Sequence, residues 1–175
     1  MTGPDPVRNQ LIEIAAIKCD PKNFGIVDTF SINVGVRSGE SSDSVLANAH
    51  PGALKKVKIC KELLELGSPP EEAVKSLREW LPEGDYIWVG YNLMLDFMFL
   101  RRAREPEIRF NYRFIDITSL IELYMYKTGK EIAEFSLESV ASSLKICTSG
   151  DLHIALNDVK LGIKVFKFLI KELNN

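Results

Sequence analysis

The chain has 175 residues, of which 46% are hydrophobic and 26% charged, and its formal net charge is −2. This length and composition predict one folded domain over residues 1–175 and exclude a disordered or low-complexity protein. The chain has no apolar run long enough to span a membrane and no apolar secretion signal in its first ten residues, and its mild acidity argues against a protein that coats duplex nucleic acid.

The first third of the chain is typical of a β-hairpin. Gln10–Lys18 is almost continuously apolar, which predicts a strand covered on both faces. Asp20–Gly25 has turn composition, and Ile26–Val36 alternates between apolar and polar residues, which predicts a second strand nearer an edge. Arg37–Asp43 is polar throughout and is predicted to be a loop.

The middle of the chain is predicted to alternate between helices and a strand. Pro51–Ile59 is expected to be a short helix that has proline in its first turn. Ser68 is the expected N-cap of a second helix, whose apolar residues keep helical spacing as far as Leu81. Asp85–Gly90 is expected to be a short buried strand, and Leu95–Arg104 a helix.

The C-terminal part predicts a strand over Phe110–Ile117 and helices over Thr118–Tyr126, Leu137–Leu144 and His153–Leu173. The whole order indicates an α/β fold with an antiparallel start and a parallel continuation. Because ligands in such sheets bind beyond the carboxyl ends of the strands, we expect a site in the loop after the strand Asp85–Gly90.

The cysteines give little sign of a disulfide framework or a zinc site. Cys19, Cys60 and Cys147 are odd in number and lie far apart, without the paired spacing of metal ligands. We therefore expect free thiols in a reducing, cytoplasmic compartment.

Residues 89–102, VGYNLMLDFMFLRR, contain the first candidate for chemistry. Asp96 lies in an otherwise apolar helix start, where a charge is costly unless it is paired or binds a metal. The alternative is an acid that the helix dipole stabilises. Asn92 is typical of a turn or cap, and Arg101 and Arg102 of a solvated helix face or a phosphate contact.

Residues 151–160, DLHIALNDVK, contain the second candidate. His153 and Asp158 lie five residues apart at the start of the last helix, so both side chains can face one cleft. A histidine can act as a general base and a carboxylate can bind a hard cation. The alternative is a capping Asp151 with an incidental histidine. Together the two segments suggest a metal-dependent hydrolase, although two-metal phosphodiester cleavage needs more carboxylates than Asp96 and Asp158.

These segments resemble the DnaQ-like, DEDDh-type 3′–5′ exonucleases of the ribonuclease H-like superfamily. Residues 89–102 are similar to the second exonuclease motif, with Asp96 as its aspartate, and His153–Asp158 to the third motif, His-x-Ala-x-x-Asp. Four further segments resemble the connecting strands and helices of the family: residues 11–18, 50–81, 113–129 and 135–146.

The resemblance implies a ribonuclease H-like mixed β-sheet flanked by helices, and an exonuclease that releases nucleoside monophosphates from DNA 3′ ends. It implies Mg²⁺ or Mn²⁺ in a two-metal site, with His153 as general base, Asp158 as a metal ligand, and Asp96 binding a metal or orienting its water.

The resemblance also extends to substrate and partners. It implies that single-stranded DNA or 3′ ends are bound, with RNA possible, and that a DNA polymerase is a possible proofreading partner. Leu54 and Ile59 would wedge against the terminal base, with plain core packing as the equal alternative, and Asn92 would lie beside the substrate.

One departure from the family concerns its first motif, an Asp-x-Glu on the first strand followed by a Thr-Thr-Gly-like turn. Met1–Pro6 is similar to the end of that turn, so the two acids and the central strand that carries them would precede Met1. Glu13 and Asp5 are nearby acids that do not match the motif. Glu13 is expected to serve the strand or the substrate edge, and Asp5 a turn. We expect a shortened form of a normal enzyme, ahead of a degenerate homologue or a strand donated by another chain. The alternative function is a catalytically inactive nucleic-acid-binding or interaction module.

Overall fold

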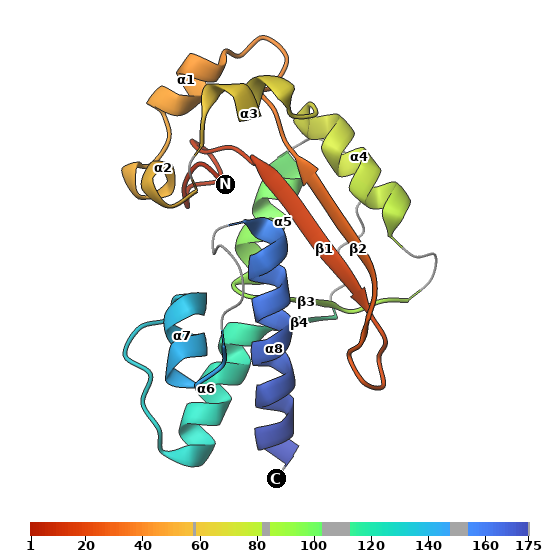
Figure 1. Cartoon of the computed structure of the whole chain (residues 1–175), viewed down its shortest axis with the longest axis vertical. Helices are drawn as coiled ribbons and strands as arrows, with labels where there is room; N and C mark the ends of the chain where they lie inside the picture. Colours follow the sequence, from red (N-terminus) through yellow and green to blue (C-terminus); the bar gives the residue numbers. More distant parts are fainter. Residues whose placement is uncertain (58, 82–84, 103–112, 148–153, 175) are drawn as a thin grey trace. The chain divides into compact units, whose positions relative to one another are not determined.

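The computed structural model describes residues 1–57, 59–81, 85–102, 113–147 and 154–174. Within these ranges the chain forms four strands and eight helices, the mixed α/β content that the sequence predicts (Figure 1). It divides into two compact units, residues 1–16, 30–86 and 94–110, and residues 17–29, 87–93 and 111–175. No helix in the described ranges is long and apolar enough to cross a membrane.

The predicted hairpin is present as β1 (Glu13–Cys19) and β2 (Ile26–Asn33), which form a two-stranded sheet. The connection is too short for parallel strands, which need a crossover of about a dozen residues, so the pair is antiparallel. The Asp20 N–H donates to the Gly25 carbonyl across the turn, at 2.9 Å. The prediction that β1 is covered on both faces is wrong, since Ile14 alone is buried in it and a two-stranded sheet encloses little surface.

The end of β2 differs from the prediction because the chain changes its pairing partner there. β2 ends at Asn33 rather than Val36, and Val34 forms a parallel bridge with Ser68. The backbone of Ser68 is used on both sides: its N–H donates to the Asn33 carbonyl at 3.0 Å, and its carbonyl accepts from the Gly35 N–H at 2.8 Å. The helix that follows has Pro69 as its N-cap, without a side-chain hydrogen bond, so the expected capping role of Ser68 is wrong.

Two glycines allow the segment that follows β2 to lie against the backbone next to Ser68. A Cβ atom on Gly35 would lie 2.4 Å from the Gly67 carbonyl oxygen, and a Cβ atom on Gly67 would lie 2.4 Å from the Gly35 nitrogen. Real Cβ atoms do not approach other atoms so closely, so the two backbones can meet only because neither residue has a side chain.

The first unit contains four helices in the middle of the chain, α1 (Ser42–Ala47), α2 (Pro51–Val57), α3 (Lys61–Leu66) and α4 (Pro70–Trp80). Helices α2 and α4 match the predictions, and α4 buries Ala73, Val74 and Leu77 on one face. Helices α1 and α3 were not predicted, and α1 begins inside the expected polar loop. Ser41 starts α1 because its side chain accepts a hydrogen bond from the Ser44 N–H at 3.2 Å.

The central parallel pair consists of β3 (Trp88–Gly90) and β4 (Phe114–Asp116). Both strands are shorter than predicted, and part of the expected second strand, residues 110–112, lies outside the described residues. In the described ranges the four strands pair as two separate two-stranded sheets, and β1 is not a hydrogen-bonded neighbour of β3. Helix α5 (Leu93–Arg102) begins two residues earlier than expected.

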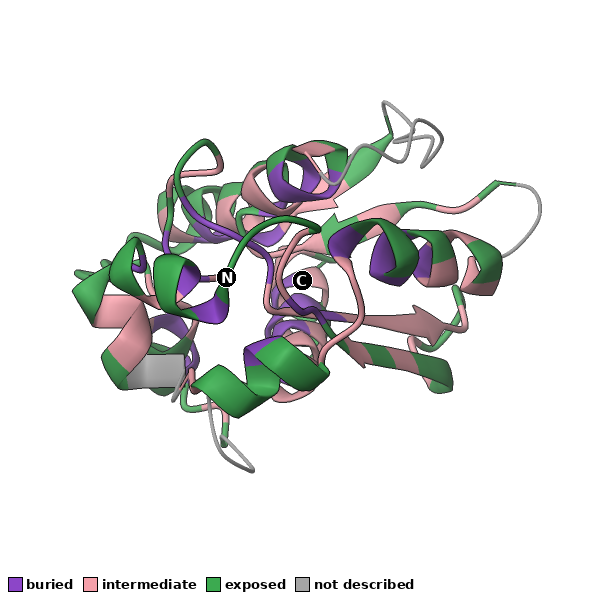
Figure 2. Cartoon of the chain, turned by 90° about the horizontal axis from the view of Figure 1, so that it is seen from above, coloured by how far each residue is buried: buried purple, intermediate pink, exposed green. Residues whose placement is uncertain are grey.

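Helices α6 (Ile117–Thr128), α7 (Leu137–Ser143) and α8 (Ala155–Asn174) form the core of the second unit. Helices α6 and α8 lie side by side (Figure 1). The rings of Phe24 and Phe166 pack in a T-shaped arrangement, with ring centroids 5.1 Å apart. Figure 2 shows helices with buried residues on one side and exposed residues on the other. The most deeply buried residues of this core are Ile117, Ile121, Tyr124, Val140, Ala141, Leu161, Val165 and Leu169.

Candidate active-site carboxylates

The turn after β3, where the sequence predicts a site, is held by the carboxylate of Asp116. This residue ends β4 and lies opposite Gly90 in the parallel register. One carboxylate oxygen accepts from the Asn92 N–H at 3.1 Å, and the other accepts from the Leu93 N–H at 2.8 Å. Asp116 thus ties the end of one strand to the first residue of the helix that follows the other.

Asp116 also begins α6 as its N-cap. The carboxylate oxygen that binds Asn92 accepts two more hydrogen bonds, from the Thr118 N–H at 3.0 Å and from the Thr118 hydroxyl at 2.7 Å. Asn92 adopts a left-handed backbone conformation (φ 54°), which asparagine tolerates better than most residues. The expected turn role of Asn92 is confirmed, whereas sequence reasoning did not single out Asp116.

Tyr91, just before this turn, is a fixed hydrogen-bond donor. Its hydroxyl donates to the Phe135 carbonyl at 2.8 Å. Burial, with the nearby charge of Asp116 adding to it, raises the pKa of Tyr91 to about 12. The phenol therefore stays protonated well above neutral pH, and its hydrogen bond joins the turn to the backbone at Phe135.

Asp96 is the fourth residue of α5 and lies on the buried side of that helix. Leu93, Phe99 and Leu100, which are three or four residues away and share its face, are all buried, and Asp96 itself is half-buried. An acidic group in such apolar surroundings is costly, although its place in the first turn of the helix is favourable.

Asp158 occupies the equivalent place in α8. It is also the fourth residue of its helix, it is half-buried, and it lies in line with Leu161, Gly162 and Val165, which are buried. Its backbone N–H donates to the Ile154 carbonyl at 3.1 Å. Each helix therefore carries one carboxylate in the first turn of its core-facing side, and these are the two aspartates that the sequence singles out.

The structure describes only some of the other residues that the sequence predicts for the site. His153 lies outside the described residues, as does Asp151. Asp96 belongs to the first compact unit and Asp158 to the second. In the described ranges no group of three or more histidine, cysteine, aspartate or glutamate side chains could hold a metal ion. Leu54 and Ile59 are both half-buried, in and just after α2.

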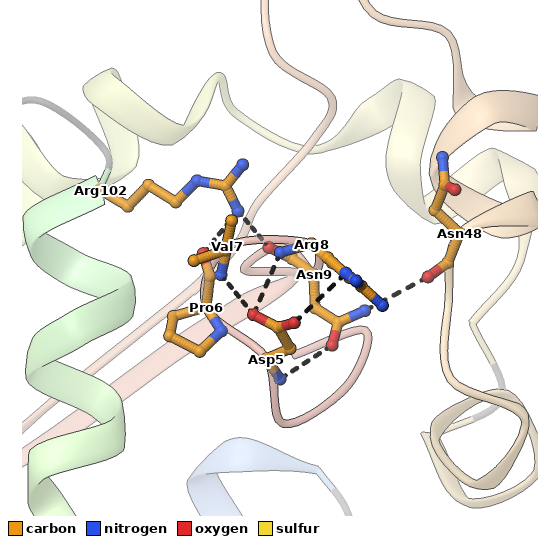
Figure 3. Close-up of polar contacts among 7 residues, drawn as sticks. All are labelled: Asp5, Pro6, Val7, Arg8, Asn9, Asn48 and Arg102. Carbon is orange, nitrogen blue, oxygen red and sulfur yellow. Dashed lines mark hydrogen bonds and ion pairs between the residues drawn. The ribbon is translucent and has the colours of Figure 1, made fainter.

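The N-terminal turn of the first unit is a dense polar network, drawn in Figure 3. Asn9 accepts from the Asp5 N–H at 2.9 Å and donates from its amide to the Asn48 carbonyl at 3.2 Å. The Asp5 carboxylate accepts from the Val7 N–H at 2.8 Å, which confirms the expected turn role of Asp5.

Arg102 connects this turn to the C-terminal end of α5. Its guanidinium donates to the Pro6 carbonyl at 2.5 Å and to the Asn9 carbonyl at 2.9 Å (Figure 3). Of the two arginines expected on a solvated face, Arg101 is exposed, while Arg102 is half-buried and bound to the backbone.

Comparison with known proteins agrees with this arrangement of elements. The exonuclease family model (RNase_T) matches residues 1–166. The chain is 26% identical to the oligoribonuclease of Vibrio vulnificus over 171 residues, covering 96% of this chain and 88% of the relative. It is 29% identical to the oligoribonuclease of Photorhabdus laumondii over 166 residues, covering 91% and 83% of the two chains.

Solved structures show the same fold. The nuclease domain of 3′hExo, a DEDDh family member bound to rAMP, superposes with a TM-score of 0.71 at 15% identity over 93% of this chain and 82% of that one. Exonuclease I of E. coli in complex with a dA16 oligonucleotide gives a TM-score of 0.73 at 16% identity over 97% of this chain and 38% of that one. The chain belongs to the exonuclease family, among the DnaQ-like proteins of ribonuclease H-like fold.

Proposed function

We propose that this chain is a metal-dependent 3′–5′ exonuclease that hydrolyses the terminal phosphodiester bonds of nucleic acids and releases nucleoside monophosphates. The observation that carries the proposal is the matched placement of Asp96 and Asp158, each in the first turn of its helix and on the buried side. Carboxylate oxygens are the donors that divalent cations take in phosphodiester hydrolysis, and the chain belongs to an exonuclease family, so a cation site fits this pair of aspartates.

The donor chemistry of these residues suits Mg²⁺ or Mn²⁺. Both ions prefer carboxylate oxygens, so Asp158 and Asp96 would hold them, and the bound cations would neutralise charge on the scissile phosphate. His153 would accept the proton of the attacking water, a role that suits an imidazole because it titrates near neutral pH. Asp116 would keep the start of α5, and with it Asp96, in place.

The proposed substrate is a single-stranded 3′ end, because a terminal base must leave its stack to enter such a site. Leu54 and Ile59, which are half-buried, would offer apolar surface to that base, with Asn92 beside it. DNA is the substrate expected from the sequence. Short RNA is the second candidate, and it is favoured by the name oligoribonuclease that the curated relatives carry. A polymerase partner and a cytoplasmic location stay predictions.

The test is digestion of 5′-labelled single-stranded DNA and RNA of matched sequence in the presence of Mn²⁺. We expect stepwise shortening from the 3′ end, and a loss of about 100-fold or more in rate for His153→Ala, Asp96→Asn and Asp158→Asn. Asp43→Asn is the matched control, since Asp43 is an exposed partner of Lys61 in an ion pair and should leave the rate unchanged.

Two outcomes would contradict the proposal. Digestion that survives all three substitutions would show that another site, or a contaminant, performs the reaction. If the chain is inert, and a version carrying an Asp-x-Glu strand ahead of Met1 is inert as well, the catalytically inactive binding module is the better description. The relative rates on DNA and RNA decide between the two substrates.

A further inference from the structure

Helix α8 carries a row of lysines on the side that faces away from its core. Lys160, Lys164, Lys167 and Lys171 follow one another at intervals of four, three and four residues, and all four are exposed. At 3.6 residues per turn these positions fall on one line about 16 Å long. We call these four residues the lysine stripe.

The stripe is on the opposite side of α8 from the residues that pack inward. Asp158, Leu161, Val165 and Leu169 mark the inward side, of which the last three are buried. Phosphates bound by the stripe would therefore be separated from those near Asp158 by the width of the helix, about 10 Å.

Three of the four lysines of the stripe lack an acidic partner in the described ranges. In the part of the chain that the structure describes, Lys160, Lys167 and Lys171 take part in no ion pair. Lys164 donates to the Cys147 carbonyl at 3.1 Å. The stripe thus presents several ammonium groups to solvent.

Two other surface helices of this chain, α3 and α4, mix their charges. Along α4, Glu71, Lys75 and Glu79 alternate in sign at intervals of four residues, and in α3 Lys61 lies 3.9 Å from Glu65. Neighbouring opposite charges stabilise a helix, and neighbouring like charges destabilise it. The like charges of the stripe therefore destabilise α8, a cost in free energy that α3 and α4 avoid. The chain as a whole has a net charge of −2, so this cluster of positive charge is local. A bound polyanion would remove the cost.

We propose that the lysine stripe binds the phosphodiester backbone of a nucleic-acid strand, at phosphates away from the 3′ end. Lysine contacts phosphate as a point charge and without regard to base sequence, which suits a nuclease that must accept any strand. The proposal rests on the nucleic-acid substrate of the proposed function and adds to it a preference for strands long enough to reach the stripe.

The surroundings of the stripe favour a nucleic acid over a lipid surface. A membrane-bound amphipathic helix inserts large apolar side chains beside its lysines. No large hydrophobic residue within α8 is among the exposed ones in the described ranges. The stripe therefore offers charge without an apolar anchor.

The experiment compares Lys160→Gln/Lys167→Gln with the matched control Lys22→Gln/Lys75→Gln, which removes the same charge from two exposed lysines elsewhere. Glutamine has nearly the helix propensity of lysine, so α8 should persist, and circular dichroism checks this. Binding of fluorescent poly-dT and of a dT trinucleotide is measured in EDTA over a series of NaCl concentrations, so that no cleavage occurs.

We expect the stripe variant alone to lose affinity for poly-dT, by about 20-fold at 0.1 M salt, with the slope of log K against log[salt] reduced by about 1.4. The trinucleotide should bind equally weakly to all three proteins. Equal losses in the stripe variant and the control, or equal affinity of the unmodified protein for both lengths, would overturn the proposal.

Vesicles of phosphatidylcholine and phosphatidylserine are tested under the same conditions. Stripe-dependent binding to these vesicles without stripe-dependent binding to poly-dT would assign the stripe to a membrane surface and overturn the proposal. Because binding is measured without metal, a failure of the exonuclease assay leaves this comparison intact, and the two proposals can fail separately.

Discussion

At the scale of single residues, the side chain of Asp116 joins several groups near the candidate site. Its two oxygens accept hydrogen bonds from the Asn92 and Leu93 N–H groups and from both donors of Thr118. Because Leu93 is the first residue of α5 and Asp96 the fourth, the same carboxylate sets where the first turn of α5 begins.

Asp116→Asn tests this role. The amide nitrogen would face N–H groups that now meet a carboxylate oxygen, so we expect a loss of about 2 kcal/mol in the free energy of unfolding. Urea denaturation measures that loss, and amide hydrogen exchange should accelerate at Asn92 and Leu93. The control is Ser136→Ala, which removes the N-cap of α7 and should leave exchange in the turn unchanged. Unaltered exchange at both amides in Asp116→Asn would contradict the role.

Tyr91→Phe tests the raised pKa of the neighbouring phenol. The pKa is about 12 in the folded protein and near 10 in an unfolded chain, so folding favours the protonated form. Its contribution to stability is complete below pH 10 and is lost as the pH rises from 10 to 12. At neutral pH we expect the free energy of unfolding of the unmodified protein to exceed that of Tyr91→Phe by about 1 kcal/mol, because the variant lacks the hydrogen bond to Phe135.

The difference should shrink above pH 10, as measured by chemical denaturation at a series of pH values. Both proteins share all other titrating groups, so their difference isolates Tyr91. A gap that stays constant to pH 12 would show that the phenol titrates in the same way in the folded and unfolded chains.

At the scale of elements, the composition and periodicity of the sequence predict most of those that the structure contains. The hairpin, the parallel pair of β3 and β4, and helices α4 and α8 all occupy the expected stretches. Helices α1 and α3 were missed because each is a short six-residue helix with one or two buried residues, too few for a periodic signal. Ser68 was assigned as a cap because its local sequence permits one, whereas its backbone is committed to Val34 and Gly35.

Arg102→Ala tests the contact between α5 and the N-terminal turn. The substitution removes the donors to the Pro6 and Asn9 carbonyls, and we expect a loss of about 2 kcal/mol in unfolding free energy and faster proteolysis within residues 5–9. Arg8→Ala is the control in the same turn, because the pairing of Arg8 with Asp5 is exposed and worth under about 1 kcal/mol. Equal effects of the two substitutions would show that Arg102 contributes no more to stability than an exposed charge such as Arg8.

At the scale of the whole molecule, the motif spacing was sufficient to identify the family, because the family depends on short segments in a fixed order. The roles of Asp96 and Asp158 stay predictions. Asp116 was not found because its importance comes from hydrogen bonds to a turn 24 residues earlier in the chain. The net charge of −2 gives no hint of the lysine stripe, since a sum over the chain hides how charges are distributed on one helix.

The contact between Gly35 and Gly67 also limits how this protein can change. The obstructing atoms at each glycine are backbone atoms of the other segment, and every amino acid has them. A side chain gained at one position cannot be offset by trimming the other, as paired substitutions in a core often are. The contact between the segment that follows β2 and the link between α3 and α4 therefore requires every variant of this chain, natural or designed, to keep glycine at both positions.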